Sequence, residues 1–178
     1  TEVIEMHQLI HGLVYADSSE EAVETARHDV FEPLVRRSVY DYVVTFDQDG
    51  HGISGADRWG SLPPAVSMET GRGEELVDRG WDATTDSYRR SFDRVEEFLS
   101  THDPKNFWEE QDVHIEYALD FRRIGQFEGP ATFLYDQDGV GIRSRDHLES
   151  VRNYWTNLGD SEPYENLELY VVPADVHY

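Results

Sequence analysis

Residues 46–53, Phe-Asp-Gln-Asp-Gly-His-Gly-Ile, recur almost unchanged as residues 135–142, Tyr-Asp-Gln-Asp-Gly-Val-Gly-Ile. Each copy follows a short run of β-branched, apolar or aromatic residues (43–45 and 132–134), which is typical of a strand. Asp side chains accept hydrogen bonds from the backbone two residues on, and Gly tolerates positive φ, so Asp-x-Asp-Gly is favourable turn chemistry. Both copies therefore predict a strand that ends in a sharp turn.

The pattern around these turns predicts an α+β fold. Alternating apolar residues, which are typical of strands, cover residues 6–16, 39–47, 113–121, 131–135 and 167–171. Helices are expected after the capping residues Ser18 and Ser144 and over residues 74–101, because each region carries an apolar stripe with helical spacing. Pro33 is expected to end or bend the first helix, and Pro173 to end the last strand.

Residues 54–124 are expected to form an insertion. Without them the order is strand-helix-strand followed by strand-helix-strand, which is the split βαβ plan of a ferredoxin-like sheet. We therefore predict a single α+β domain over residues 1–178. A loop at 54–72, the long helix and the strand at 113–121 are inserted between its second and third strands. Asp103-Pro104 would also suit the start of a helix, which is the alternative for the last of these elements.

The long helix carries an apolar stripe that must pack on the sheet or on a partner. Its members, spaced by three and four residues, are Val77, Trp81, Thr84, Tyr88, Phe92, Val95 and Leu99. Packing in the core is the simpler interpretation. For a partner contact we expect Trp59 and Trp81, with the cationic Arg143 and Arg145, because aromatic residues and arginines dominate interface energetics.

The chain is strongly acidic. Its 178 residues include 37 acidic and 15 basic ones, which gives a net charge of −22, and Lys105 is the sole lysine. This charge disfavours binding to nucleic-acid phosphates and to anionic membranes. The absence of Cys excludes disulfides, thiolate nucleophiles and Cys-ligated zinc. No long apolar run and no signal-peptide pattern are seen, so a cytoplasmic location is expected.

The acidic, lysine-poor composition resembles that of small uncharacterised acidic proteins of haloarchaea and their viruses. The resemblance concerns composition alone, and it implies a high-salt cytoplasm or a virion assembled there. At 1 M salt the Debye length is only about 3 Å, so the self-repulsion of the compact state is largely screened. We therefore expect a halophilic protein whose folding depends on salt.

The acidic turns also raise the question of ligands. Asp-x-Asp-Gly is the middle of an EF-hand loop, but position twelve, which must be Glu, would be Ala56 or Arg145, so an EF-hand is excluded. Residues 50–55 spell the Gly-x-Gly-x-x-Gly of dinucleotide sites, yet no helix pattern follows, so no dinucleotide is expected. A weakly bound divalent cation is left open, with the candidate ligands Asp47, Asp49, Asp136 and Asp138.

Three histidines suggest a second metal hypothesis. His7 and His11 share one face of the first strand. In the ferredoxin-like plan the last strand lies antiparallel beside the first, so His177 could approach His7. The three side chains would suit zinc, nickel or iron. Residues four apart on a strand are about 13 Å apart, however, so the alternative is separate, half-exposed sheet histidines.

A hydrolytic site is the remaining chemical hypothesis. His51 could act as a general base that Asp57 orients, with Ser54 as the nucleophile. The second copy of the phrase has Val140 in place of the histidine, and no Gly-x-Ser-x-Gly elbow surrounds the serine.

The leading functional prediction is a non-enzymatic interaction or assembly protein. It would be an adaptor, a regulator or a virion-associated component that binds a protein partner or forms a homo-oligomer. The alternative is a divalent-cation-dependent enzyme or binding protein that uses the Asp-x-Asp-Gly turns. Bound metal would favour the alternative, and a defined oligomer without metal would favour the leading prediction.

Overall fold

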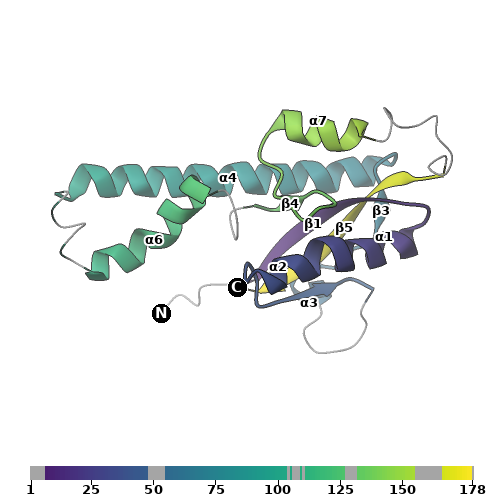
Figure 1. Cartoon of the computed structure of the whole chain (residues 1–178), viewed down its shortest axis with the longest axis horizontal. Coiled ribbons are helices and arrows are strands. Elements are labelled where there is room, and N and C mark those ends of the chain that lie inside the picture. The colour runs from purple at the N-terminus through teal and green to yellow at the C-terminus, as the bar shows by residue number, and fades with distance from the viewer. Residues whose placement is uncertain are drawn as a thin grey trace.

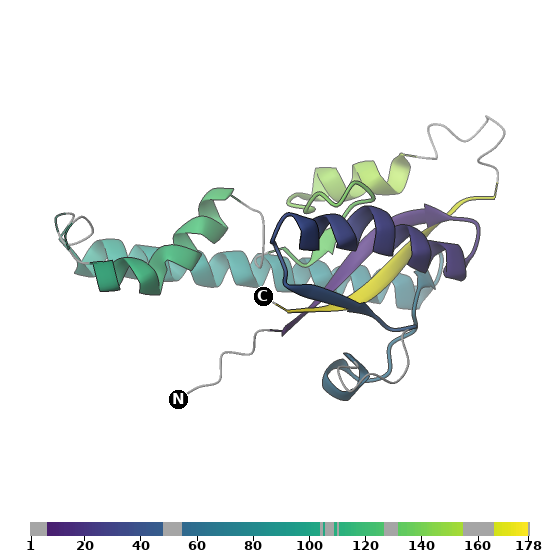
Figure 2. The same cartoon turned by 60° about the horizontal axis from the view of Figure 1, so that its bottom comes forward.

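The computed structural model describes residues 7–47, 55–103, 105, 109, 111–126, 132–154 and 166–177. A mixed five-stranded sheet lies between two layers of helices, and a pair of helices extends to one side (Figures 1 and 2). The predicted α+β class is thereby confirmed. Within the described residues, none of the helices is both long enough and apolar enough to cross a bilayer.

The sheet is built around two long antiparallel strands. Its five strands in chain order are β1 (His7–Ala16), β2 (Tyr42–Thr45), β3 (Val66–Ser67), β4 (Leu134–Tyr135) and β5 (Glu168–His177). β1 and β5 pair over their whole length, with His7 opposite His177 and Ala16 opposite Glu168. β4 lies parallel to β1, while β2 and β3 both pair with the other edge of β5.

The strand order is β2-β5-β1-β4. The expected antiparallel pairing of the last strand with the first is present. In a ferredoxin-like sheet, however, β2 would lie beside β4, and here it lies beside β5, at the opposite edge. The ferredoxin-like order is therefore not confirmed.

Pro173 lies within β5, so the prediction that it ends the last strand is wrong. Its partner on β1 is His11, whose backbone N–H donates to the carbonyl of Phe133 on the other side, 2.9 Å away. At the other edge of β5, β3 pairs as far as Val171 and β2 only from Ala174 onward. The N–H that proline lacks thus falls in the gap between two short strands, where none of the described strands has an acceptor for it.

One face of the sheet is covered by the first helical run. This run consists of α1 (Ser19–Thr25), the π-helical η1 (Ala26–Phe31) and α2 (Glu32–Arg36). Ile10 and Val14 of β1 pack against it, in one apolar cluster with Phe31 of η1. Pro33 does not end the run. The wider π-helical turn before this residue accommodates a ring that has no N–H and would crowd the preceding carbonyls of an α-helix.

The first helix begins as the sequence predicts. The Ser18 hydroxyl accepts a hydrogen bond from the N–H of Glu21 at 3.2 Å. The Glu21 carboxylate accepts from the N–H of Asp17 at 2.8 Å, one residue earlier than in the usual capping box. Ser144 caps α7 (Arg145–Asn153) in the same way, accepting from the N–H of His147 at 3.0 Å.

The opposite face of the sheet is covered by α4 (Gly71–Thr101) and α7. Leu9 and Leu13 of β1 pack there with Leu76 of α4 and Leu148 of α7. α4 has 31 residues and is about 46 Å long, so only its first half lies on the sheet. Its second half extends beyond the sheet and packs against α6 (Gln111–Gln126) (Figures 1 and 2).

Two predictions for the inserted residues need correction. The expected loop at 54–72 contains a short helix, α3 (Gly55–Trp59), as well as β3. The expected strand at 113–121 is helical and belongs to α6. In this alternating set, every second residue is also four positions from the following one, as on one face of a helix. Tyr117 and Phe121 therefore fit a helix as well as a strand. Both contact Phe98 of α4, with ring centroids 4.8 and 5.7 Å away.

Candidate functional site

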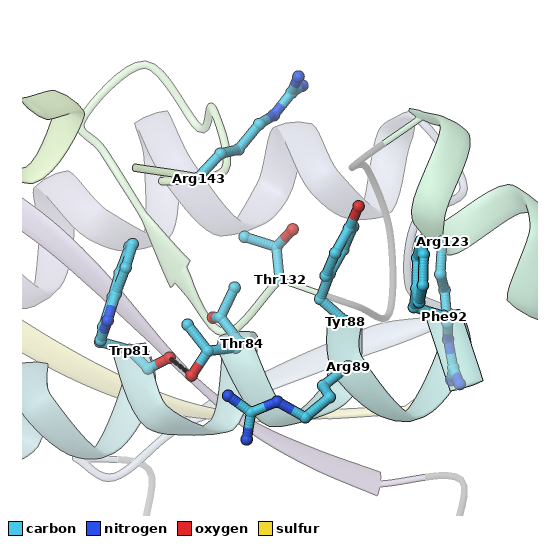
Figure 3. A pocket seen from close by; sticks show the side chains of 9 residues that line it. Trp81, Thr84, Tyr88, Arg89, Phe92, Arg123, Thr132 and Arg143 are labelled. Carbon is cyan, nitrogen blue, oxygen red and sulfur yellow. Dashed lines mark hydrogen bonds between the residues drawn. The ribbon is translucent and has the colours of Figure 1, made fainter. Parts of the chain in front are cut away.

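A groove runs along the middle of α4, between the end of α6 and the segment that leads from β4 to α7 (Figure 3). Its volume is about 590 Å³, within the range of binding sites for small molecules and side chains. Trp81 and Tyr88 rise from α4 in the same direction (Figure 3). The lining residues are Trp81, Thr84, Thr85, Tyr88, Arg89, Phe92, Arg123, Thr132 and Arg143.

The floor of the groove is fixed to the sheet by Thr84. Its hydroxyl donates to the carbonyl of Gly80 at 2.8 Å and accepts the backbone N–H of Phe133 at 3.0 Å. At Gly80 the helix approaches β4 so closely that an added Cβ would lie 2.7 Å from Leu134. A glycine is therefore needed for α4 to reach this depth, and the groove has a rigid base.

The apolar stripe predicted for α4 is only partly covered. Val77 and Val95 are buried, but Tyr88, Phe92 and Leu99 are 36%, 49% and 65% exposed. We call the run of five exposed or half-buried positions along this side the outward stripe; it consists of Trp81, Thr85, Tyr88, Phe92 and Leu99.

α4 turns a different, more polar face towards α6. Ser87, Ser91 and Phe98 are the buried residues of this face. They lie roughly a quarter of a turn from the outward stripe, since successive residues of an α-helix are about 100° apart. Because this polar face packs on α6, the large apolar side chains of the outward stripe remain exposed to solvent.

A buried carboxylate explains this choice. Asp120 of α6 accepts hydrogen bonds from the Ser91 hydroxyl at 2.9 Å and from Arg94 Nε at 2.7 Å. The guanidinium of Arg123 lies 3.8 Å from the same carboxylate. Because a buried charge must be paired and hydrogen-bonded, this network fixes the rotation of α4 relative to α6.

Cationic groups gather around the groove in an otherwise acidic chain. Arg89, Arg123 and Arg143 belong to its lining. Arg145 lies over the ring of Trp81, with its guanidinium carbon 4.8 Å from the ring centroid, which is a cation–π contact. Arg123 has a buried Nε for which the described residues provide no hydrogen-bond acceptor. The groove is thus aromatic in its walls and positive at its rim.

Three of the four residues predicted to contact a partner lie together here: Trp81, Arg143 and Arg145. The fourth, Trp59, lies elsewhere, on α3, where its indole N–H donates to Asp175 at 3.0 Å. The apolar stripe in the sequence indicated the groove, but Arg89 was missed as one of its lining residues. Its charge gave no signal, because arginines on a helix are ordinary surface residues.

A family comparison covers almost the whole chain. The family model described as Domain of unknown function (DUF7995) matches residues 6–178. The chain belongs to the DUF7995 family. No curated protein and no solved structure matches it.

The predicted histidine site is only partly assembled. His7 and His177 lie opposite each other at one end of the sheet, with ring centroids 5.0 Å apart. His11 shares their face but lies under Gly80 of α4, and burial lowers its pKa to about 4. Nowhere in the described part of the chain do three His, Asp or Glu side chains converge in a way that could hold a metal ion.

Beside His7 lies a buried acid that the sequence patterns did not single out. Asp175 of β5 is fully buried and accepts hydrogen bonds from Arg58 at 2.8 Å and Trp59 at 3.0 Å. Its carboxylate also lies 3.2 Å from Nδ1 of His7. Arg58 and Trp59 belong to α3, so Asp175 attaches this helix to the sheet. Because the last strand was expected to end at Pro173, Asp175 lay outside it and nothing in the sequence marked it as buried.

The second Asp-Gly phrase is a turn, as predicted. One carboxylate oxygen of Asp136 accepts the N–H groups of Asp138 and Val140 at 3.0 and 2.9 Å. Gly139 has a φ of 70°, which favours glycine. The other oxygen of Asp136 lies 2.9 Å from Nε2 of His147. Asp138 is exposed.

The first phrase is described only in part. Asp47 pairs with Arg27 at 2.8 Å. Partial burial would raise the pKa of Asp47, but hydrogen bonds from Thr45 and Arg27 hold it below its usual value. The predictions for Asp49, His51 and Ser54 lie outside the described residues. Asp57, the proposed orienting acid, is exposed on α3.

Proposed function

We propose that this protein is a non-enzymatic interaction or assembly protein that binds another protein chain through the outward stripe of α4 and the groove beside it. The observation that carries the proposal is the exposure of Tyr88, Phe92 and Leu99 along one side of a single helix. Single exposed apolar residues are common, but a contiguous row beside an apolar groove is typical of an interaction surface.

The chemistry of the surface supports a protein partner. Aromatic residues and arginine are enriched at the centres of protein interfaces, whereas lysine and acidic residues are depleted there. Trp81, Tyr88 and Phe92 supply the aromatic area. Arg89, which lies 3.7 Å from the exposed Asp86, and Arg143 supply positive charges that would attract a carboxylate of the partner.

The alternative, a divalent-cation-dependent enzyme or binding protein at the acidic turns, has weaker support. Both oxygens of Asp136 already have partners, in the backbone of its own turn and in His147. The Asp47 carboxylate is paired with Arg27.

The setting belongs to the same proposal. We place the protein in a high-salt cytoplasm, or in a particle assembled there, because a net charge of −22 on a chain of this size needs screening. As for the scaffold, the antiparallel β1–β5 pair and the parallel β1–β4 pair support a variant of the ferredoxin-like split βαβ plan in which β2 has moved to the other edge.

Site-specific photo-crosslinking tests the proposal. A photoreactive amino acid replaces Phe92 in the full chain, which is expressed in the organism that carries the gene and irradiated in its native salt. We expect one discrete adduct with a protein chain. The matched control is position 90, because Arg90 is exposed on the opposite side of α4. If position 92 gives no adduct beyond that of position 90, the proposal is wrong.

A further inference from the structure

We infer that the partner on this surface is a second copy of the same chain, paired antiparallel along α4 about a two-fold axis near Phe92. The inference rests on the proposed function and names its partner. It is carried by three features of α4: the spacing of its exposed residues, the charges beside them, and the positions of the groove and of Leu99.

The outward stripe has the spacing of a coiled-coil seam. With Val95 included, its positions are separated alternately by four and three residues, and they are 81, 85, 88, 92, 95 and 99. This seam extends for about 27 Å. Val95 is buried, while Tyr88, Phe92 and Leu99 are exposed. A second helix would complete the packing that α6 leaves unfinished.

Charges beside the seam favour an antiparallel pair. Asp82, Arg89 and Glu96 recur every seven residues along the exposed edge. If the two-fold axis passes between positions 92 and 93, Arg89 of each chain lies level with the partner's Glu96, and both pairs are attractive. Asp82 would lie level with position 103, beyond the end of the helix. In a parallel pair, Arg89 would instead face position 84 of the partner, which is an uncharged threonine, and neither ion pair would form.

The same symmetry places a protruding side chain opposite the groove. Leu99, 65% exposed, would lie level with position 86 of the partner, between Thr85 and Tyr88, which line the groove. Each groove would then receive the leucine of the other chain, twice in one isologous interface. Phe92 would meet the partner's Phe92 at the axis, where aromatic pairs add to simple area burial.

Salt decides whether this pairing is observed. Two chains that each carry a net charge of −22 repel one another over a Debye length of about 10 Å at 0.1 M salt, but only about 3 Å at 1 M. The apolar contacts of the seam do not depend on charge, so the dimer becomes more stable as the repulsion is screened. Dimerisation is therefore expected to increase with salt, unlike association that depends on exposed ion pairs alone.

Light scattering after size-exclusion chromatography of the full chain in about 2 M KCl measures the mass directly. We expect a dimer. Phe92→Ser and Leu99→Ser should each weaken the dimer about tenfold or more, since either change acts on both halves of the interface. Arg90→Ser, on the opposite side of α4, is the control and should leave the mass unchanged. Because these residues are exposed, the variants should keep the wild-type circular dichroism spectrum.

Charge exchange tests the register. At the lowest KCl concentration that still supports the wild-type dimer, Arg89→Glu and Glu96→Arg should each weaken it about two- to tenfold. The double variant R89E/E96R should restore it. A dimer that neither single change weakens, or that the double change fails to restore, overturns the antiparallel register.

A monomer in about 2 M KCl at concentrations up to about 100 µM overturns the inference as a whole. The proposed function fails separately. If position 92 crosslinks to a different protein while the chain is monomeric, the interaction surface stands and its occupant is not a second copy. If no adduct forms at position 92 at all, both are wrong.

Discussion

Nε of Arg94 lies 2.7 Å from the carboxylate of Asp120, which is buried between α4 and α6. This contact, with the Ser91 hydroxyl on the other carboxylate oxygen, joins the two helices through polar groups. It decides which face of α4 meets α6 and so which face meets solvent. The exposure of the outward stripe is therefore a consequence of one buried acid.

Asp120→Ala should loosen α6 without unfolding the sheet. The change leaves the Ser91 hydroxyl and the Arg94 guanidinium without their acceptor, at a cost of about 1–3 kcal/mol. Hydrogen exchange should show faster exchange for α6 amides and unchanged exchange for β1 and β5. The exposed Asp93→Ala is the matched control. Equal protection of α6 in both variants would contradict the assignment.

Asp175→Ala should destabilise the whole fold. The side chain is fully buried, and its loss leaves the indole N–H of Trp59 and the guanidinium of Arg58 without an acceptor. Arg58 is partly exposed and can recover water, so we expect a loss of about 2–4 kcal/mol in the free energy of unfolding. Asp41→Ala, which removes the exposed partner of His177, should cost less than about 1 kcal/mol. Urea unfolding at fixed salt gives the free energy of unfolding of each variant and so compares the two losses.

The buried His11 should make stability fall with acidification. Burial lowers its pKa from 6.5 to about 4, so the unfolded chain binds the proton first as the pH falls. Its contribution is complete above about pH 6.5 and is lost towards about pH 4, by up to about 3 kcal/mol. His11→Leu should flatten this part of the pH profile of unfolding, whereas the exposed His28→Leu should not. A wild-type slope in the His11 variant would exclude it as the source.

Salt should stabilise the folded chain. The net charge of −22 opposes compaction, and added KCl shortens the range of that repulsion. We expect the Tm to rise between about 0.1 M and 2 M KCl, measured at a protein concentration low enough to keep the chain monomeric. A Tm that is the same at both concentrations would rule out the halophilic interpretation of the composition.

Local signals in the sequence were sufficient for much of the fold. Ser18 and Ser144 cap helices because a side-chain oxygen needs only the next few N–H groups, and Asp136 forms its turn for the same reason. The pairing of the last strand with the first followed from the order of elements. These features depend on residues that are close along the chain, or on an order of strands and helices that many folds share.

Features that depend on distant neighbours could not be predicted. Pro173 is tolerated in β5 only because β2 and β3 leave a gap beside it. Residues 113–121 have a pattern that fits both periods, and the contact with Phe98 selects the helix. Asp120 and Asp175 resemble any other acid among 37 until their arginine partners on other elements are known.

The functional site, like the fold, could be predicted only where its signals lie close together in the sequence. The stripe on α4 and the cationic Arg143 and Arg145 were recognisable from spacing and charge. Which part of the stripe is exposed depends on the rotation that Asp120 imposes, which no pattern within α4 encodes.

The continuity of α4 constrains how this chain can change in length. The helix is anchored on the sheet at Leu76 and Val77 and runs without interruption to Leu99. Inserting one residue between these points would rotate the far half by about 100° and carry Phe92 away from its present direction, whereas a seven-residue insertion would nearly restore it. Only insertions or deletions in α4 whose length is close to a multiple of seven residues would therefore keep the same side chains exposed.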